Sequence, residues 1–220
     1  MIKPTGVPEP AAVAELLGML ALGELLAFER MAADARLAPD LHRRATLCQM
    51  AAQEMVNYQR LVARLAELGV DPEQAMAPYE PPLRGYHDRT QPRDWPEALT
   101  KAYLGDSVAD DFVREVAALL APADRKLVLQ VLHDSQYAEF AAAEIRAAID
   151  ADARVAHRLS MWGRRLMGEG LWQAQQVAGA RPHLAALITS GTGDSDGVAA
   201  LLKRLAAGHT ERMVAVGLNP

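Results

Sequence analysis

The sequence AAQEMVNYQRL, which runs from Ala51 to Leu61, contains the pattern that decides the fold. Apolar residues recur around it at spacings of three and four, which predicts one buried face of an α-helix. Glu54 and Asn57 lie on that face, three residues apart, where apolar side chains are expected. The full stripe consists of Leu47, Met50, Glu54, Asn57, Leu61, Leu65 and Leu68. A carboxylate and an amide are therefore predicted to lie inside a helical core.

The sequence VLHDSQYAEF, from Val131 to Phe140, repeats the pattern with Asp134 and Tyr137. Two more helical stripes are interrupted by acids near their middle. The acids on the four predicted stripes are Glu24, Glu54, Asp106 with Asp110, and Asp134. Burying isolated carboxylates is very costly, so four acids at matching heights predict a shared neutralising partner.

Prolines and capping residues divide the chain into six predicted helices. They cover about 11–36, 41–68, 95–120, 123–149, 152–178 and 197–216. The third begins at DWPE, Asp94 to Glu97, which combines a capping aspartate, a first-turn proline and a capping-box glutamate. Residues 69–94 contain five prolines and leave room for only one short helix.

The long segment 69–94 predicts the topology. A helix over 41–68 is roughly 40 Å long, and the segment is long enough to return along it, so that the third helix runs parallel to the second. Two antiparallel hairpins joined by one crossover form the ferritin-like four-helix bundle. An up-down-up-down bundle, in which the segment 69–94 is a long loop that does not cross the bundle, stays open as an alternative. We therefore predict an all-α, single ferritin-like domain over 1–220, with a bundle core at about 11–149 and two additional C-terminal helices at about 152–216, packed outside it.

Composition limits the environment and the partners. Half of the 220 residues are hydrophobic, which suffices for a substantial core. A formal net charge of −5 gives no overall attraction to nucleic acid, and a single cysteine excludes an internal disulfide. The apolar run 16–28 is interrupted by Glu24 and is too short to span a bilayer. The expectation is a cytoplasmic protein without a signal peptide or a membrane partner.

A dinuclear metal centre is one way to neutralise the clustered acids. Di-iron carboxylate bundles take one acid from each of two helices and Glu-x-x-His from each of the other two. The spacing of three directs two ligands at the same metal pair, because such residues share a helix face.

Four segments resemble a known family. LALGELLAFERMAADARLAP (20–39), MAAQEMVNYQRL (50–61), EALTKAYLGDSVADDFVRE (97–115) and LHDSQYAEF (132–140) are similar to actinobacterial ferritin-like proteins related to the tRNA 2-methylthio-N6-isopentenyladenosine hydroxylase. The resemblance covers nearly the whole chain and implies a di-iron site that activates O₂. It places Glu24, Glu54 and Asp134 at metal-ligand positions. In the third helix Asp106 is nearest in spacing, and Asp110 lies one turn further on.

This sequence departs from the family pattern at two positions. Asn57 and Tyr137 stand where the relatives carry histidine, so both nitrogen ligands are replaced. An oxygen-only site suits magnesium or manganese better than iron. Alternatively, Asn57 and Tyr137 donate hydrogen bonds to the carboxylates and take the place of a metal. Both are therefore candidate functional residues.

Two functions follow from this pattern. The first is a ferritin-like, hydroxylase-type oxidoreductase with a degenerate dinuclear site, acting on a small-molecule substrate or on tRNA. The second is a metal-free helical bundle that uses the same position as a pocket for a small molecule or a partner. A homodimer is also considered.

Overall fold

The computed structural model describes residues 9–132, 135–192 and 195–220, and within these ranges the chain forms helices and no strands. The elements are α1 (Pro10–Asp34), η1 (Ala35–Leu37), α2 (Leu41–Glu67), α3 (Pro72–Met76), η2 (Ala77–Tyr79), α4 (Glu80–Arg89), α5 (Trp95–Lys101), η3 (Ala102–Asp106), α6 (Ser107–Ala117), α7 (Pro122–Gln130), α8 (Ser135–Ala151), α9 (Arg154–Ala180), α10 (Pro182–Thr192) and α11 (Ser195–Ala215). The prediction of an all-α protein is confirmed.

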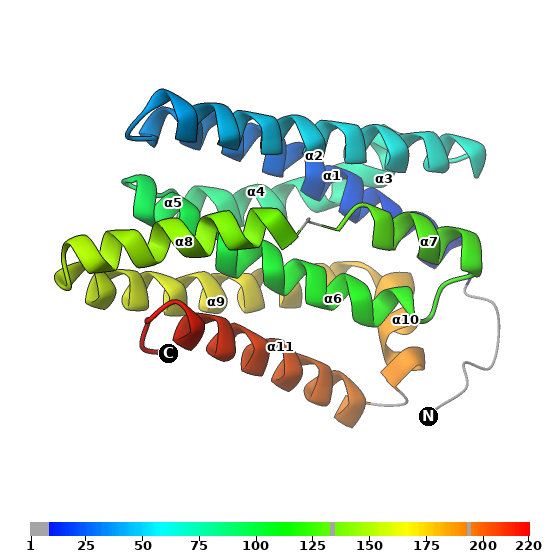
Figure 1. Cartoon of the computed structure of the whole chain (residues 1–220). Helices are drawn as coiled ribbons and strands as arrows, with labels where there is room; N and C mark the ends of the chain where they lie inside the picture. The colour runs from blue at the N-terminus through cyan, green and yellow to red at the C-terminus, as the bar shows by residue number, and fades with distance from the viewer. Residues whose placement is uncertain (1–8, 133–134, 193–194) are drawn as a thin grey trace.

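The topology is that of a ferritin-like bundle (Figure 1). α1 and α2 form an antiparallel hairpin, and the crossover carries the chain back so that α5 and α6 run parallel to α2. α7 and α8 follow each other along the return path and complete the second hairpin. The crossover holds two short helices and a 3-10 turn, so the expectation of only one short helix was wrong. The prolines did not prevent this, because Pro72, Pro81 and Pro82 lie at first-turn positions, where no backbone N–H is needed.

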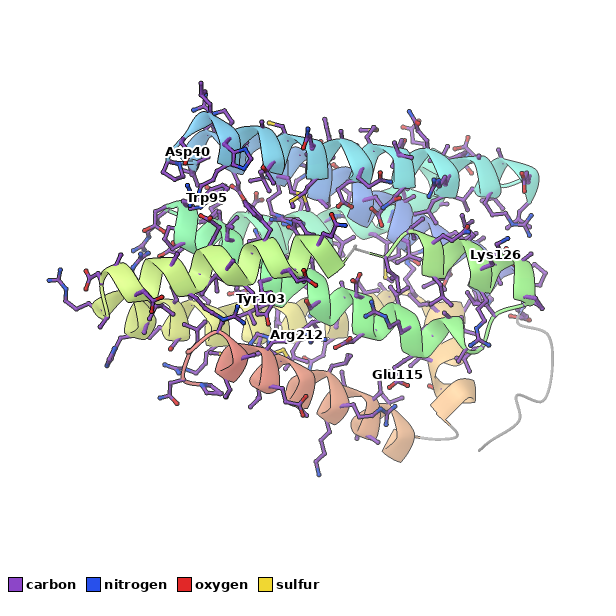
Figure 2. The ribbon with its side chains drawn as sticks, in the orientation of Figure 1. Asp40, Trp95, Tyr103, Glu115, Lys126 and Arg212 are labelled. Atoms are coloured by element: carbon purple, nitrogen blue, oxygen red, sulfur yellow. The ribbon has the colours of Figure 1, made fainter. Side chains whose placement is uncertain are left out.

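Aspartates fix where α2 and α5 begin. The side chain of Asp40 accepts a hydrogen bond from the Arg43 backbone N–H at 2.8 Å, and Asp94 accepts one from the Glu97 N–H at 3.0 Å. Asp40 and Trp95 lie at the same end of the bundle (Figure 2). There Glu144 of α8 accepts hydrogen bonds from Trp95 Nε1 at 2.9 Å and Arg43 Nε at 2.6 Å, which ties three helices together.

The core consists of two apolar clusters. The first includes Leu16, Leu17, Leu61, Leu65, Val113, Val116 and Val128. The second includes Met31, Leu47, Leu99, Leu104, Ala141, Ile145, Leu159 and Trp162. On each of the first three bundle helices the change from one cluster to the other falls beside the acids of the predicted stripe. A polar layer therefore lies at the middle of the bundle.

The C-terminal helices are more involved in the core than the sequence suggested. Leu159, Trp162 and Leu166 of α9 are buried in the second cluster, so α9 forms a wall of the core rather than an outer layer. A helix that was not predicted, α10, contributes Leu184 and Leu187 to the first cluster. Its short LAALI segment carries too few turns of periodicity to be recognised against the glycine-rich sequence that follows.

α11 is joined to α6 by charge. Arg204 Nε lies 2.7 Å from a Glu115 carboxylate oxygen, and an Arg212 Nη atom lies 2.5 Å from an Asp111 oxygen. Glu115 and Arg212 mark these two helices in Figure 2. The carboxylate of Asp111 therefore pairs with Arg212 of α11 and points away from the polar layer.

α1 with η1 (Pro10–Leu37) is long and apolar enough to cross a membrane by length and composition. Half of its most apolar window is buried inside the bundle, however, as is common for the core helix of a soluble protein. The close approach of α3 supports this role, because a Cβ at Gly18 would collide with the backbone carbonyl of Ala75.

Candidate functional site

The polar layer between the apolar clusters has two parts. The acid half consists of Glu24, Glu54, Asn57 and Asp110. The paired half consists of Arg30, Asp34, Lys101, Asp106 and Tyr137. Of these nine residues, all but Asp106 are buried, and the Asp106 side chain is 17% exposed.

The acid half brings together two carboxyl groups from the α1–α2 hairpin. Glu24 and Glu54 are hydrogen-bonded to each other through their side chains. Burial, followed by the hydrogen bond and charge of Glu54, raises the pKa of Glu24 to about 11. With this pKa, Glu24 stays protonated at neutral pH and can donate its proton in the hydrogen bond to Glu54.

Asn57 closes the acid half on the side of α7. Its Nδ2 donates to Glu24 Oε2 at 3.4 Å and to the Val131 backbone carbonyl at 3.2 Å, while its Oδ1 accepts from Gln53 Nε2 at 3.2 Å. The amide thus presents N–H groups, not an oxygen lone pair, to the carboxyl cluster. In this orientation Asn57 acts as a hydrogen-bond donor where a metal ligand would need to be an acceptor.

The third helix contributes aspartates to both halves. Asp110 is 8% exposed, and its charge acts on Glu24, which places it on the acid side. An Arg114 Nη atom lies 3.7 Å from Asp110. Asp106, four residues earlier, belongs to the paired half. The candidate Asp134 lies outside the described residues.

The paired half is organised around a buried arginine. Arg30 Nη2 donates to Asp106 Oδ2 at 2.8 Å, and Arg30 Nη1 lies 3.8 Å from Asp34 Oδ2. Tyr137 Oη donates to the same Asp106 oxygen at 3.0 Å. Although burial opposes its charge, Asp106 holds the pKa of Arg30 above its usual value. Burial and the Asp106 charge raise the pKa of Tyr137, so the phenol stays protonated and donates.

A second cation lies deeper in the paired half. Lys101 is 2% exposed, its Nζ donates to the Thr90 carbonyl at 2.8 Å, and it lies 5.3 Å from the centre of the Tyr86 ring. Burial and the nearby Arg30 lower the pKa of Lys101 to about 7, against the opposing charges of Asp34 and Asp106. Burial also raises the pKa of Asp34.

A local change in helix geometry delivers Asp106. The chain passes through a π turn at η3 before α6 begins. Gly105 in this turn faces Tyr86, whose Oη would lie 3.0 Å from a Cβ at that position. π turns interrupt the α-helical register and are frequent at functional sites. Here the turn lets Asp106 reach Arg30 while Asp110 stays beside Glu24.

A dinuclear centre in a ferritin-like bundle would need carboxylates of the polar layer as its ligands. Among the described residues no group of three or more histidine, cysteine, aspartate or glutamate side chains is arranged to hold a metal ion. Asp106 is already bound by a guanidinium and a phenol, and Asn57 turns its N–H groups toward Glu24. A cation beside Arg30 would meet repulsion in a medium where screening is weak. The described part of the site does not fit two metal ions.

Sequence reasoning missed the two cations. Arg30 lies next to Met31, on the flank of the stripe, and a long guanidinium side chain reaches the core from there. The spacing of four between Arg30 and Asp34 was the available signal, since it is typical of a helical ion pair. Lys101 had a weaker signal, a single charge inside a stretch, Trp95 to Leu104, that is largely buried.

Comparisons with known proteins agree with this architecture. The family model described as "Ferritin-like domain, actinomycetes" matches residues 9–191. A solved structure, a protein with aldehyde deformylating oxidase activity from Synechococcus, matches with a TM-score of 0.68 and 20% sequence identity, over 94% of this chain and 90% of that chain. At this identity the likeness shows the fold alone. No curated protein matches the sequence.

Proposed function

This chain belongs to the ferritin-like domain family of actinomycetes, and we propose that it is a metal-independent member that binds a small molecule or a partner beside its polar layer. The observation that carries the proposal is the contact of Arg30 with Asp106 at 2.8 Å, supported by Tyr137. A guanidinium inside the bundle supplies the positive charge that a metal ion would otherwise supply.

The charges of the paired half support this proposal. Arg30 and Lys101 face Asp34 and Asp106, so the formal charges balance when all four groups are ionised. The acid half lowers its negative charge differently, because the raised pKa of Glu24 keeps that carboxyl group protonated. When no metal is present, a buried carboxyl group must either pair with a cation or stay protonated.

A hydroxylase-type oxidoreductase is the second candidate. It is favoured by the contact of Glu24 with Glu54, which lies where the sequence resemblance to the tRNA hydroxylase relatives places two metal ligands. In that reading the substrate is a small molecule or tRNA, and the substitutions at Asn57 and Tyr137 alter the metal preference. Cytoplasmic localisation and a homodimer fit either function.

Anaerobic iron loading followed by elemental analysis separates the two functions. We expect the native chain to hold far less than one iron per chain after removal of loosely bound metal. The double variant Asn57→His/Tyr137→His should gain little, and adding Arg30→Met should raise the iron content, because this triple variant restores two nitrogen ligands and removes the internal cation. The same loading with manganese serves as a second arm.

About two irons per chain in the native protein would overturn the proposal and favour the hydroxylase. A full gain of iron in the double variant alone would show that the missing histidines, and not Arg30, set the metal content. Circular dichroism of each variant confirms that the bundle is intact before the metal content is compared.

A further inference from the structure

We propose that the hollow between α2 and α7 binds a small molecule that carries a carboxylate on an apolar body. This inference rests on the binding function proposed above and gives it a site and a ligand class. The hollow has a volume of about 610 Å³, within the range of ~300–1,000 Å³ that is typical of small-molecule sites. Its lining consists of Arg60, Ala63, Arg64, Glu67, Ala123, Leu127 and Gln130.

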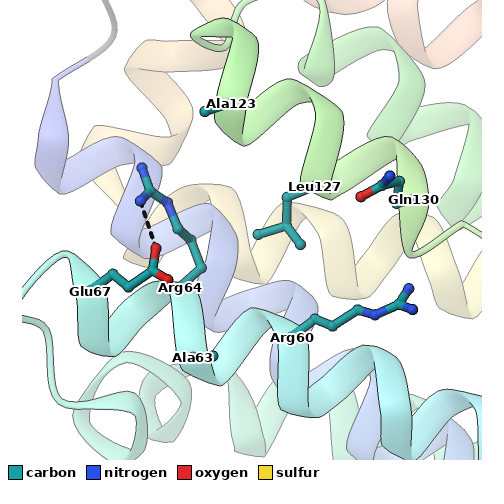
Figure 3. Close-up of a pocket in the computed structure, with 7 residues that line it drawn as sticks. All are labelled: Arg60, Ala63, Arg64, Glu67, Ala123, Leu127 and Gln130. Atoms are coloured by element: carbon teal, nitrogen blue, oxygen red, sulfur yellow. Dashed lines mark hydrogen bonds and ion pairs between the residues drawn. The ribbon is translucent and has the colours of Figure 1, made fainter.

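The two helices line the hollow with different chemistry. In Figure 3, Leu127 projects from α7 into the gap, and Arg60 extends along the same gap from α2. Ala63 and Ala123 are small, so they leave the space beside Leu127 open. Gln130 lies on α7 at the same end of the hollow as Arg60 (Figure 3). One end is therefore polar and the middle is apolar.

The two arginines of the hollow differ in their ion pairing. Arg64 Nε lies 2.8 Å from Asp124, and Arg64 Nη1 lies 2.9 Å from Glu67. The guanidinium of Arg64 is therefore already paired with two carboxylates. Arg60, four residues earlier on the same helix, forms no hydrogen bond or ion pair within the part of the chain that the structure describes. Its planar guanidinium can therefore bind a carboxylate through two parallel hydrogen bonds.

The pairing of charges in the hollow indicates a monoanion. The two positive charges of Arg60 and Arg64 and the two negative charges of Glu67 and Asp124 sum to zero, but both acids contact Arg64, so Arg60 has no ionic contact within the described residues. One unpaired cation matches one carboxylate, whereas a phosphate dianion or a nucleic-acid backbone needs several. The apolar surface of Leu127, Ala63 and Ala123 matches the body of such a ligand.

The hollow adjoins the polar layer. Asn57 lies one turn before Arg60 on α2, and Val131 directly follows Gln130. The hydrogen bond from Asn57 to the Val131 carbonyl at 3.2 Å joins these two walls. The same Asn57 contacts Glu24, so hydrogen bonds of this amide link the α7 side of the hollow to the acid half.

Benzoate, benzyl alcohol and benzylammonium are suitable probes, because they share a ring and differ in charge. We would titrate the full-length native protein with each, and with inorganic phosphate, and follow backbone amide signals by ¹H–¹⁵N NMR. Benzoate should shift the amides of Ala63, Leu127 and Gln130 in a saturable manner. Benzyl alcohol should bind about tenfold more weakly, because it lacks the charge-assisted hydrogen bonds to Arg60.

Two variants locate the site. Arg60→Gln removes the guanidinium from an exposed position and should raise the Kd for benzoate about tenfold. Ala63→Phe fills the apolar middle and should abolish the saturable shifts. Arg44→Gln is the matched control, since Arg44 is an exposed arginine of α2 outside the hollow, and it should leave the Kd unchanged.

Several results would overturn this inference. They are equal affinity for benzoate and benzyl alcohol, phosphate binding as tightly as benzoate, shifts that map elsewhere, and an Arg60→Gln variant that binds like native protein. The hypothesis of a ligand in the hollow can fail without the hypothesis of a metal-independent function, because the iron content of the native chain is measured in a separate experiment. Benzoate binding in an iron-loaded protein would uphold the site and overturn metal independence.

Discussion

The acid half and the paired half of the polar layer lie at the same depth but stabilise their carboxyl groups in opposite ways. In the acid half, the raised pKa of Glu24 keeps it protonated, and its side chain is hydrogen-bonded to Glu54. In the paired half, Asp106 faces Arg30 at 2.8 Å and accepts a second hydrogen bond from Tyr137. Protonation removes the charge of Glu24 in one half, and cations balance the carboxylate charges in the other. The comparison shows two routes by which a helical bundle buries carboxyl groups without a metal ion.

The two routes differ in their sensitivity to solvent conditions. The proton on the Glu24 carboxyl group is lost as the pH rises toward its raised pKa, whereas an arginine remains charged at any pH that a protein tolerates. The pair of Arg30 and Asp106 should therefore be a fixed structural element. The groups that should respond to pH are Glu24 in the acid half and Lys101 in the paired half.

The largest effect is expected when the paired half loses its arginine. Arg30→Met leaves Asp106 without its cation and should lower the free energy of unfolding by about 3–5 kcal/mol, measured by urea denaturation. Arg30→Met/Asp106→Asn should recover part of this loss, because no carboxylate is then left uncompensated. Arg43→Met is the control. Arg43 pairs with Glu144 but its side chain is 36% exposed, so it should cost at most about 1 kcal/mol. Equal losses at Arg30 and Arg43 would contradict the role assigned to Arg30.

The second effect concerns pH in the acid half. The pKa of Glu24 rises from an ordinary 4.5 to about 11 on folding, so its contribution to stability is complete below pH 4.5 and is lost as the pH rises toward 11. Each pH unit in that window costs up to ~1.4 kcal/mol. Glu24→Gln keeps the shape of the protonated group and should gain about 2–3 kcal/mol on native protein between pH 6 and pH 8. Parallel stability curves for the two proteins would show that Glu24 is ionised in the fold.

A smaller effect of opposite sign is expected in the paired half. The pKa of Lys101 falls from 10.5 to about 7, so its contribution is complete above pH 10.5 and is lost as the pH falls toward 7. Native stability should therefore gain from Lys101 between pH 7 and pH 9 while it loses from Glu24. Lys101→Met should remove this gain, about 1–2 kcal/mol over that range, and make the decline caused by Glu24 steeper. A pH profile unchanged by Lys101→Met would contradict a lowered pKa.

The fold followed from the sequence because its signals are local. Helix periodicity, the capping residues Asp40 and Asp94, and the length of 69–94 were sufficient for the all-α bundle with its crossover. The acids at the middle of the first three stripes also predicted where the polar layer lies, and the fourth acid, Asp134, lies outside the described residues. α10 was missed because its apolar segment is short.

The details of the site were harder to predict, because they depend on contacts between helices. Nothing local to Arg30 indicates that it meets Asp106, which is 76 residues away. The π turn likewise has no periodic signal, and without it the choice between Asp106 and Asp110 stayed open. The structure uses both, one in each half.

The π turn at Ala102–Asp106 also determines which genetic changes this chain tolerates. A π turn holds one residue more than an α turn, so loss of a single codon there would restore a plain α-helix. Asp110, Val113 and Ala117 would keep their places in the core, because the residue lost is the one that the π turn holds in excess. Loss of the Phe112 codon, in the regular part of α6, would instead rotate every later residue of α6 by about 100° around the helix axis. Val113 and Ala117 would then leave the core together. The reading frame is preserved in both cases, but only the second deletion disrupts the folded protein.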